Sequence, residues 1–545
     1  MKKRISLALV FVLMLCVFTA GASATAENSG EKIAVYNIGV FDETLDPCER
    51  HTTASVNMYI NLNGYLYRLN LKGEWEPELA EGYTISDDGL VWTVSLKPGL
   101  VFSSGNPITA EDVVYSWTRA ADPYYASEYA FILYYIKGME AFNMSLEDDS
   151  PLTYEEAMAE VGLKVLDDLT VEITLENPTP FFDQMLGYNT YAVIDKVFCE
   201  SVDEFGSSPE TISTAGPFVV AEWKKDEYIL AKKNENYYDA DNVKLDGVKF
   251  TFVQNVGTEL TLFETGEVDL TNLEMSTADM MMYEAQGILR SFQTLGTGWL
   301  AYNCTTAPYD DVKVRQALVM ALDQDSICRT VIGGGVAPAD GFIPLSMPSA
   351  ANPSEPFRTV SYIDVHGNVE EAQKLLAEAG YPGGEGFPAG FLSYGVTSDR
   401  NRAISEAMCA MWKTNLGIDI SPDGQESRAR LDNRMSGNFD ITFQGWGADM
   451  ADPTTFLDCM LSNHFYNYGK YDNPAFDEAM KNAALNGGDP VARTEYLREA
   501  ERILMEDMPV IMFQFSTKVY LQADRLVDVV ASPLAIFDLK WADLP

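Results

Sequence analysis

Apolar and polar residues alternate along several short stretches of the chain. Between residues 91 and 102, Trp92, Val94 and Leu96 fall on one face of an extended chain, because successive side chains of a strand point to opposite sides. The run Lys97-Pro98-Gly99 follows and contains residues that favour a turn. The pattern therefore predicts a strand, a turn and a second strand.

Start and stop signals for helices occur between such stretches. Thr109, with Asp112 three residues later, resembles a helix N-terminus, and the pattern continues through Trp117. Residues 371–379 have helical spacing, and Gly380 follows them, as glycine often does at the end of a helix. We predict one helix at each of these places.

A further helix is predicted near the C-terminus, where apolar residues three and four apart share one face: Leu497, Ala500, Ile503 and Leu504. Strand and helix signals alternate along the whole chain. No Ser/Gly linker, low-complexity tract or internal repeat divides it. This mixture predicts an α/β or α+β fold with two or more lobes.

The first residues have the pattern of a secretory signal peptide. A basic start precedes an apolar stretch over residues 7–18. Ala22-Ser23-Ala24 is a small-residue cleavage signal, and Ala24-Thr25-Ala26 is an equal alternative. The apolar stretch is too short for a transmembrane helix, and no later stretch approaches the needed length. We expect export of the protein and removal of residues 1–24.

A lipid anchor on Cys16 is the alternative for this N-terminus. Bacterial lipoproteins carry small residues directly before the lipidated cysteine, whereas Leu13-Met14-Leu15 are bulky. The sequence therefore favours a cleaved signal peptide without a lipid. The other six cysteines have no CxxC spacing, so their pairing stays open.

Composition and charge narrow the range of partners. Hydrophobic residues make up 47% of the 545 residues and charged residues 22%, which is the balance of a globular protein. Asp and Glu number 81 against 38 Lys and Arg, which gives a net charge of −43. A surface this acidic repels phosphate backbones and anionic lipid headgroups, so nucleic-acid binding is excluded as the main function.

Sequence motifs for catalysis, metals and cofactors are missing. The three histidines, at positions 51, 366 and 464, cannot form a His-Glu-x-x-His zinc site, and there is no Gly-x-Ser-x-Gly nucleophile elbow. A Ser–His pair or a pair of carboxylates could still assemble from distant residues, but no motif points to one. We therefore expect no catalytic residue, metal or cofactor, and a function in recognition.

Seven blocks of sequence carry a family resemblance over nearly the whole chain. The first is EWEPELAEGYTISDDGLVWTVSLKPGLVFSSGNPITAEDVVYSWTRAADP, residues 74–123. The others follow in order: GPFVVAEWKKDEYILAKKNENYYDA, GEVDL, APYDDVKVRQALVMALDQDSI, EAQKLLAEAGYPGGEGFP, FDITFQGWGADMADPTTFL and YDNPAFDEAM. Together they resemble the family 5 extracytoplasmic solute-binding proteins, receptors that deliver oligopeptides, dipeptides, nickel and related ligands to ABC importers. The stretches ADPYYASEYA and PTTFLDCMLSN resemble the oligopeptide-binding branch.

The resemblance implies an α/β fold, a two-lobed periplasmic-binding-protein clamp of type II with an extra subdomain in lobe I. Lobe I would comprise residues 25–62, residues 196–295 and a C-terminal return over residues 516–545. The extra subdomain would span residues 63–195, and lobe II residues 296–515. Hinge closure would enclose the ligand between the lobes.

The resemblance also implies which residues bind a peptide. Asp449 stands where oligopeptide receptors hold the peptide α-ammonium, and a buried ammonium needs a partner of opposite charge. Gly445 would hydrogen-bond the peptide backbone as an added strand, and Trp446 would floor a side-chain pocket. Tyr129 matches a ligand-contacting tyrosine. Thr53 lies in the loop by which lobe I would lend backbone groups to the peptide.

The part of the site that would hold the peptide carboxylate departs from the family pattern. Three positions where relatives can carry Arg, Lys and His hold other residues here: Phe443, Ile332 and Asn401. Arg434 is retained, and Arg400 and Arg402 flank one of these positions. We take these three arginines as candidates, because a guanidinium can bind both carboxylate oxygens. The departure leaves the preferred peptide length open.

We therefore expect a periplasmic or otherwise extracytoplasmic receptor of an ABC importer. It would act as a monomer, bind oligopeptides and deliver them to the transmembrane subunits of the permease. The alternatives are another solute, such as a nickel complex or an oligosaccharide, an exported hydrolase, and a chaperone-like or adhesive role. The scarcity of histidine weakens the nickel alternative, and Asp449 favours an amine-bearing ligand.

Overall fold

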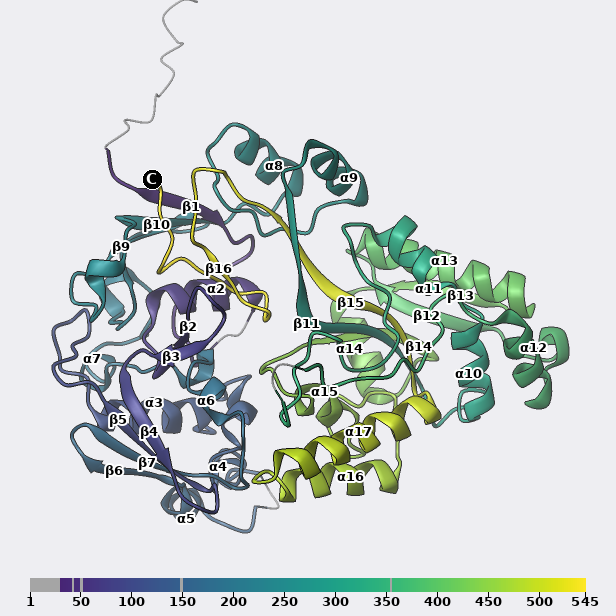
Figure 1. Ribbon diagram of the computed structural model, residues 1–545, viewed down its shortest axis with the longest axis horizontal. Helices are drawn as coiled ribbons and strands as arrows, with labels where there is room; N and C mark the ends of the chain where they lie inside the picture. Colours follow the sequence, from purple (N-terminus) through teal and green to yellow (C-terminus); the bar gives the residue numbers. More distant parts are fainter. Residues whose placement is uncertain (1–29, 42–43, 50–51, 148–149, 353–354) are drawn as a thin grey trace, which may run out of the picture.

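The computed structural model describes residues 30–41, 44–49, 52–147, 150–352 and 355–545. The expected signal peptide and Cys16 therefore lie outside the described residues. Figure 1 shows two bodies joined by a pair of long strands. The N-terminal part of the chain builds the left body, and the chain from about residue 300 to 500 builds most of the right one.

The first sheet of the left body gathers segments that are far apart in the sequence. Its strands, in spatial order, are β1 (Ile33–Asn37), β10 (Gly247–Thr251), β9 (Tyr228–Lys233) and β8 (Phe218–Lys224). α2 (Thr53–Leu62) contacts this sheet and β17 (Phe537–Asp538), which pairs with β16 (Val530–Ala531). α8 (Val256–Glu264) and α9 (Thr277–Gln286) lie at the top of Figure 1, next to the start of β11 (Leu289–Tyr302). The backbone N–H of Phe537 donates to the Asn57 side chain (2.7 Å), and Phe537 packs in one core with Tyr36. The C-terminal segment is therefore part of this body.

A second sheet with its own core forms the lower part of the left body (Figure 1). Its strands, in spatial order, are β4 (Ala80–Ile85), β5 (Val91–Leu96), β7 (Thr170–Thr174) and β6 (Leu163–Asp167). The neighbouring elements are β2 (Tyr67–Leu69), β3 (Trp75–Pro77), α3 (Ala110–Ala121), α4 (Met139–Asn143), α5 (Tyr154–Glu160), α6 (Phe182–Met185) and α7 (Lys196–Cys199). Trp92, Val94 and Leu96 are buried on one face of β5, as predicted. The Thr109 backbone N–H donates to Asp112 (2.8 Å), which confirms the predicted start of α3.

The right body is built on a five-stranded sheet. Its strands, in spatial order, are β13 (Ile420–Gln425), β12 (Gly390–Gly395), β14 (Ile441–Gly447), β11 (Leu289–Tyr302) and β15 (Val510–Leu521). The helices of this body are α10 (Val312–Met320), α11 (Gln324–Ile327), α12 (Val369–Glu378), α13 (Asp399–Leu416), α14 (Ser427–Ser436), α15 (Thr454–Leu457), α16 (Pro474–Leu485) and α17 (Pro490–Asp507). Buried Trp299 and Trp412 belong to the core between sheet and helices.

The strands β11 and β15 connect the two bodies. They pair antiparallel from Leu289 opposite Leu521 to Ala301 opposite Val510, and Figure 1 shows them crossing from one body to the other. Phe292, near the start of β11, packs against the core of the left body, whereas Trp299 lies in the core of the right body. The expected lobe boundaries at residues 296 and 515 fall inside these two strands.

Two further helices agree with the pattern analysis, and one predicted strand does not. α12 begins two residues before the helix expected over residues 371–379 and ends one residue before its expected end, and α17 buries Leu497, Ala500 and Leu504 on one face. The second strand predicted before residue 102 is wrong, because the chain turns again at once and leaves only an isolated bridge between Val101 and Pro107. Within the described ranges, no helix is both long and apolar enough to cross a membrane.

Candidate functional site

Asp449 lies where the two bodies meet, in the loop between β14 and α15. Its carboxylate accepts a hydrogen bond from the hydroxyl of Tyr188, a residue of the left body (2.9 Å). Its backbone N–H donates to the Thr455 hydroxyl (3.1 Å). Asp449 is 9% exposed. The sequence prediction therefore falls on a buried carboxylate at the junction of the bodies.

The Asp449 carboxylate has hydrogen-bond donors but no protein cation. Burial raises its pKa to about 7, and hydrogen bonds to Tyr188, Thr455 and Trp446 only partly oppose this rise. No ion pair joins Asp449 to a Lys, Arg or His among the described residues. A buried carboxylate of this kind gains most from a positively charged group that enters its surroundings.

Beside Asp449, one edge of β14 lacks a strand partner. β11 pairs with β14 along its whole length, from Tyr302 opposite Ile441 to Gly296 opposite Gly447. On the other side, β12 reaches only Ile441 and Thr442. In the part of the chain that the structure describes, the edge over residues 443–447 is thus open to another strand.

The hydrogen bonding of β14 fixes which backbone groups face this open edge. The N–H of Ala448 donates to the carbonyl of Leu295 (2.7 Å), and antiparallel pairing then directs every second residue of β14 toward β11. The backbone groups of Phe443, Gly445 and Gly447 therefore face away from β11. The Gly445 carbonyl already accepts a hydrogen bond from the Tyr466 hydroxyl (2.8 Å).

Aromatic side chains surround Asp449 from both bodies. The Trp446 ring meets Tyr466 edge to face at 4.8 Å, and its indole N–H donates to Thr455 (3.2 Å). Burial, together with the negative charge of Asp449, raises the pKa of Tyr129 above its usual range. The structure therefore brings Tyr129 and Trp446, two of the residues predicted to contact the ligand, together around Asp449.

A cavity of about 770 Å³ extends from Asp449 between the two bodies. Its aromatic walls come from both sides: Phe131, Tyr134, Tyr135, Phe181, Trp446 and Phe465. A smaller pocket of about 40 Å³ also reaches Asp449 and is lined mainly by apolar groups, among them Trp75, Leu534 and Ile536. Asp449 thus lines both hollows, and a group bound to it could extend into either.

Arg434 lies on α14 and has a neighbour that the sequence analysis missed. Its guanidinium lies 4.7 Å from the centre of the Tyr468 ring. Arg430, one helical turn earlier, donates to the carbonyl of Phe443 (3.4 Å) on the open edge of β14. The Nε atoms of both arginines are buried without an acceptor among the described residues. The spacing of four residues on a helix could have identified Arg430 as a partner of Arg434.

Burial and the nearby charge of Arg434 lower the pKa of Arg430. Among the described residues, neither arginine forms an ion pair with a carboxylate. Two adjacent, partly buried guanidiniums without an ion pair favour the binding of an anion between them or beside them.

The other candidates for the carboxylate end are already paired. Arg400 forms an ion pair with Glu274 of the left body, and Arg402 pairs with Asp399 on its own helix (2.9 Å). Thr53 begins α2, but its side chain lies outside the described part of the structure. The structure therefore singles out Arg434 from the three arginines that the sequence offers.

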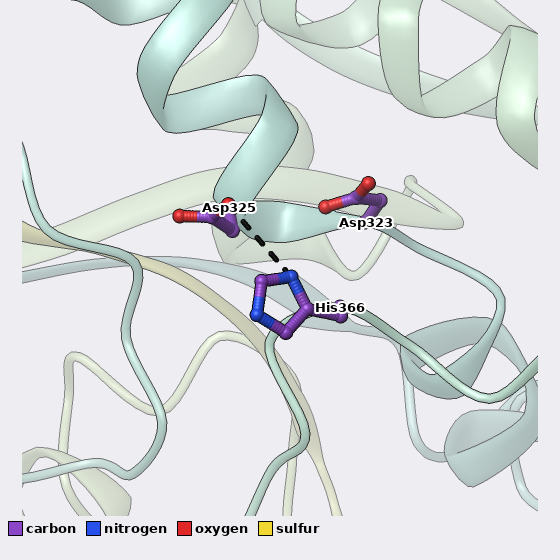
Figure 2. A group of neighbouring side chains, drawn as sticks. All are labelled: Asp323, Asp325 and His366. Carbon is purple, nitrogen blue, oxygen red and sulfur yellow. Dashed lines mark ion pairs between the residues drawn. The ribbon is translucent and has the colours of Figure 1, made fainter.

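One cluster on the right body has the composition of a metal site: Asp323, Asp325 and His366 (Figure 2). Each carboxylate already has a protein partner. Asp323 accepts from the backbone N–H of Ser326 at the start of α11 (2.9 Å), and Asp325 pairs with Arg329 (2.5 Å) and with His366 (3.7 Å). These bonds stabilise the start of α11 and the loop that contains His366. The cluster lies on other elements of the right body than Asp449, which follows β14.

Comparison with known proteins places these features in context. A model of the bacterial extracellular solute-binding proteins, family 5 Middle, matches residues 74–468. The oligopeptide-binding protein OppA of Bacillus subtilis is 31% identical over 543 residues, 97% of each chain. Among solved structures, an oligopeptide-binding protein (OppAIV) of Borrelia burgdorferi has a TM-score of 0.78 at 28% identity, covering 94% of this chain and 99% of that one.

A second solved structure contains a ligand. Haemophilus influenzae OppA in complex with the peptide RPPGFSPFR has a TM-score of 0.76 at 26% identity, covering 94% of this chain and 99% of that one. These likenesses confirm the fold expected from the sequence and the resemblance on which that expectation rested.

Proposed function

The chain belongs to the bacterial extracellular solute-binding proteins of family 5, and we propose that it is the oligopeptide receptor of an ABC importer. It captures peptides between its two lobes outside the cytoplasm and delivers them to the transmembrane subunits of the permease. The observation that carries this proposal is the buried Asp449 carboxylate beside the edge of β14, where the described residues supply neither a cation for the carboxylate nor a strand for the edge.

Asp449 holds the α-ammonium of the peptide. An ammonium placed against this carboxylate forms a charge-assisted hydrogen bond in a water-poor site and stabilises the ionised form of Asp449. The hydroxyl of Tyr188 donates to the carboxylate, and the backbone N–H of Asp449 donates to the hydroxyl of Thr455. These two hydrogen bonds fix the carboxylate in place. Trp446 and Tyr129 exclude water around the pair.

The backbone of the peptide adds a strand to the open edge of β14. The outward-facing N–H groups of Phe443, Gly445 and Gly447 supply hydrogen bonds that do not depend on the peptide side chains, whereas the carbonyls of Phe443 and Gly445 already accept from protein side chains. Gly445 suits this position, because a Cβ there would lie 3.1 Å from the carbonyl of Thr297. Main-chain pairing of this kind fits a receptor for peptides of varied sequence.

The carboxylate end of the peptide meets Arg434, with Arg430 beside it. The support is the pair of partly buried guanidiniums, each with an Nε atom that has no acceptor among the described residues. A carboxylate would relieve the repulsion between them and satisfy both donors.

The lobes close about the crossing strands β11 and β15, with lobe boundaries near residues 296 and 515. The receptor acts as a monomer and returns its peptide intact, without hydrolysis. The Asp449 carboxylate selects an amine, which favours a peptide over an oligosaccharide. The described residues around Asp449 contain no histidine cluster that could bind a nickel complex.

Native mass spectrometry of freshly purified protein tests this function. We expect co-purified species with peptide masses, and after their removal a rise in melting temperature with a peptide library. At a hundredfold excess over Kd, the stabilisation should reach about 2.7 kcal/mol. Co-purified sugar or metal-complex masses, or steady cleavage of the added peptides, would contradict the proposal.

A further inference from the structure

The cavity next to Asp449 contains a second carboxylate, that of Asp458, directly after α15. Among the described residues, this carboxylate has no hydrogen bond and no ion pair. Burial and the negative charge of Asp452 raise its pKa to about 7, although Arg493 lies near enough to oppose this rise. Asp458 therefore lies on the cavity wall with a carboxylate that has no partner among the described residues.

Among the described residues, Arg493 is the one arginine on the cavity wall, and it already forms an ion pair with Asp452. Arg493 binds both oxygens of Asp452 (2.7 and 2.8 Å), and this buried pair is neutral as a unit. Burial lowers the pKa of His464, so this wall residue is uncharged at neutral pH. The net charge of the lining therefore comes from the four carboxylates that have no ion pair among the described residues, which are Asp449, Asp458, Glu140 and Glu176.

The remaining walls suit the aliphatic stem and the charged end of a long side chain. Tyr135 and Phe181 meet edge to face at 5.4 Å, and Phe465 forms part of the opposite wall. Burial and the charges of Asp458, Asp452 and Asp449 together raise the pKa of Tyr135 above its usual range, so all three carboxylates lie near one phenol ring. Aromatic faces also attract cations directly.

We propose that this cavity selects a Lys or Arg as the first residue of the peptide, with the side-chain cation held by Asp458. The inference rests on the proposed function, because Asp449 must first hold the α-ammonium. That anchor places the first Cα one bond away from the ammonium, at the wall that Asp449 shares with the cavity. Of the two hollows that Asp449 lines, only this one, at about 770 Å³ against about 40 Å³, has room for a long first side chain, and an acidic side chain there would meet carboxylates that have no ion pair.

Calorimetry with matched tripeptides tests this selection. Lys-Ala-Ala and norleucine-Ala-Ala have side chains of similar length, and only the lysine is charged. We expect the wild-type protein to bind the lysine peptide at least about tenfold more tightly, the scale of one hydrogen bond to a charged group. In Asp458→Asn, whose folding is checked by its melting temperature, the preference for the lysine peptide should be largely lost, because the group that holds the side-chain cation is gone. Asp419→Asn, a variant at an exposed ion pair with Lys413, should keep the wild-type ratio.

Each failure has a distinct meaning. A wild-type protein that binds both peptides equally, or an Asp458→Asn protein that keeps the preference, would overturn the cationic pocket and leave the proposed function standing. A wild-type protein that binds neither peptide would contradict the proposed function and this inference together.

Discussion

The hydroxyl of Tyr188 donates a hydrogen bond of 2.9 Å to the carboxylate of Asp449, across the junction of the two bodies. The same bond orients the carboxylate and ties the bodies together. A second contact supports it, since the N–H of Ala451 donates to the side chain of Gln184 (2.9 Å). The surroundings of the Asp449 carboxylate are therefore built from both bodies.

Replacing Tyr188 with Phe should weaken the binding of peptides with a free amine. The substitution removes a donor to a charged acceptor, which is worth about 1.5–3 kcal/mol. The affinity should fall about 10- to 150-fold by calorimetry. N-acetylated peptides, which do not pair with Asp449, should lose less. An equal loss for both kinds of peptide would show that Tyr188 acts through general packing.

Peptide binding should release a proton near pH 6. Burial raises the pKa of Asp449 to about 7, and a bound ammonium lowers it, because it stabilises the ionised form. The affinity should therefore rise with pH up to about 7 and fall again above about pH 8, where the peptide α-ammonium loses its proton. Calorimetry at pH 6 in two buffers of different ionisation enthalpy measures the release. Ala-Ala-Ala is the suitable peptide, because its first side chain is an uncharged methyl group that cannot pair with Asp458.

The control for this pH dependence is Asp449→Asn, which has no carboxyl group to titrate at that position. We expect no proton release on binding by this variant, and none by the wild type with acetylated Ala-Ala-Ala. The same release from the variant would assign the titration to another group, such as Asp458, whose pKa is also about 7.

The arginine pair on α14 should recognise the peptide C-terminus. Arg434→Met keeps an apolar stem and removes the charge, so peptides with a free carboxylate should bind about 10- to 150-fold more weakly. Peptides with a C-terminal amide should be nearly unaffected. Arg428→Met is the matched control, because Arg428 is 92% exposed on the same helix. A variant that loses both kinds of peptide equally would argue against carboxylate recognition.

The sequence predicts local structure well where one pattern decides it. The alternation of Trp92, Val94 and Leu96 identifies β5, and Thr109 with Asp112 identifies the start of α3. The strand expected before residue 102 fails because the chain folds back immediately, a tertiary effect that alternation does not encode. Spatial order in the sheets likewise depends on contacts between distant segments, such as that of Phe537 with Asn57.

The candidate site shows the same division. The sequence predicts Asp449, Trp446 and Tyr129 as site residues through the family resemblance, and the structure places the three close together. Arg430 and Asp458 lie in or near the blocks that carry the resemblance, without a motif of their own. Arg430 is distinguished by its burial next to Arg434, and Asp458 by its burial beside an Arg493 that already pairs with Asp452. Both properties depend on contacts that exist only in the folded chain.

A double cycle in calorimetry measures whether Asp449 is the anchor for the peptide amine. Wild type and Asp449→Asn are each measured with the free and the N-acetylated form of one peptide. Removing either partner of the buried pair should cost about 2–5 kcal/mol, or roughly 30- to 5000-fold in affinity. The two losses should not add, because each removes the same interaction. Additive losses, or an Asp449→Asn protein as tight as wild type for the free peptide, would contradict the account.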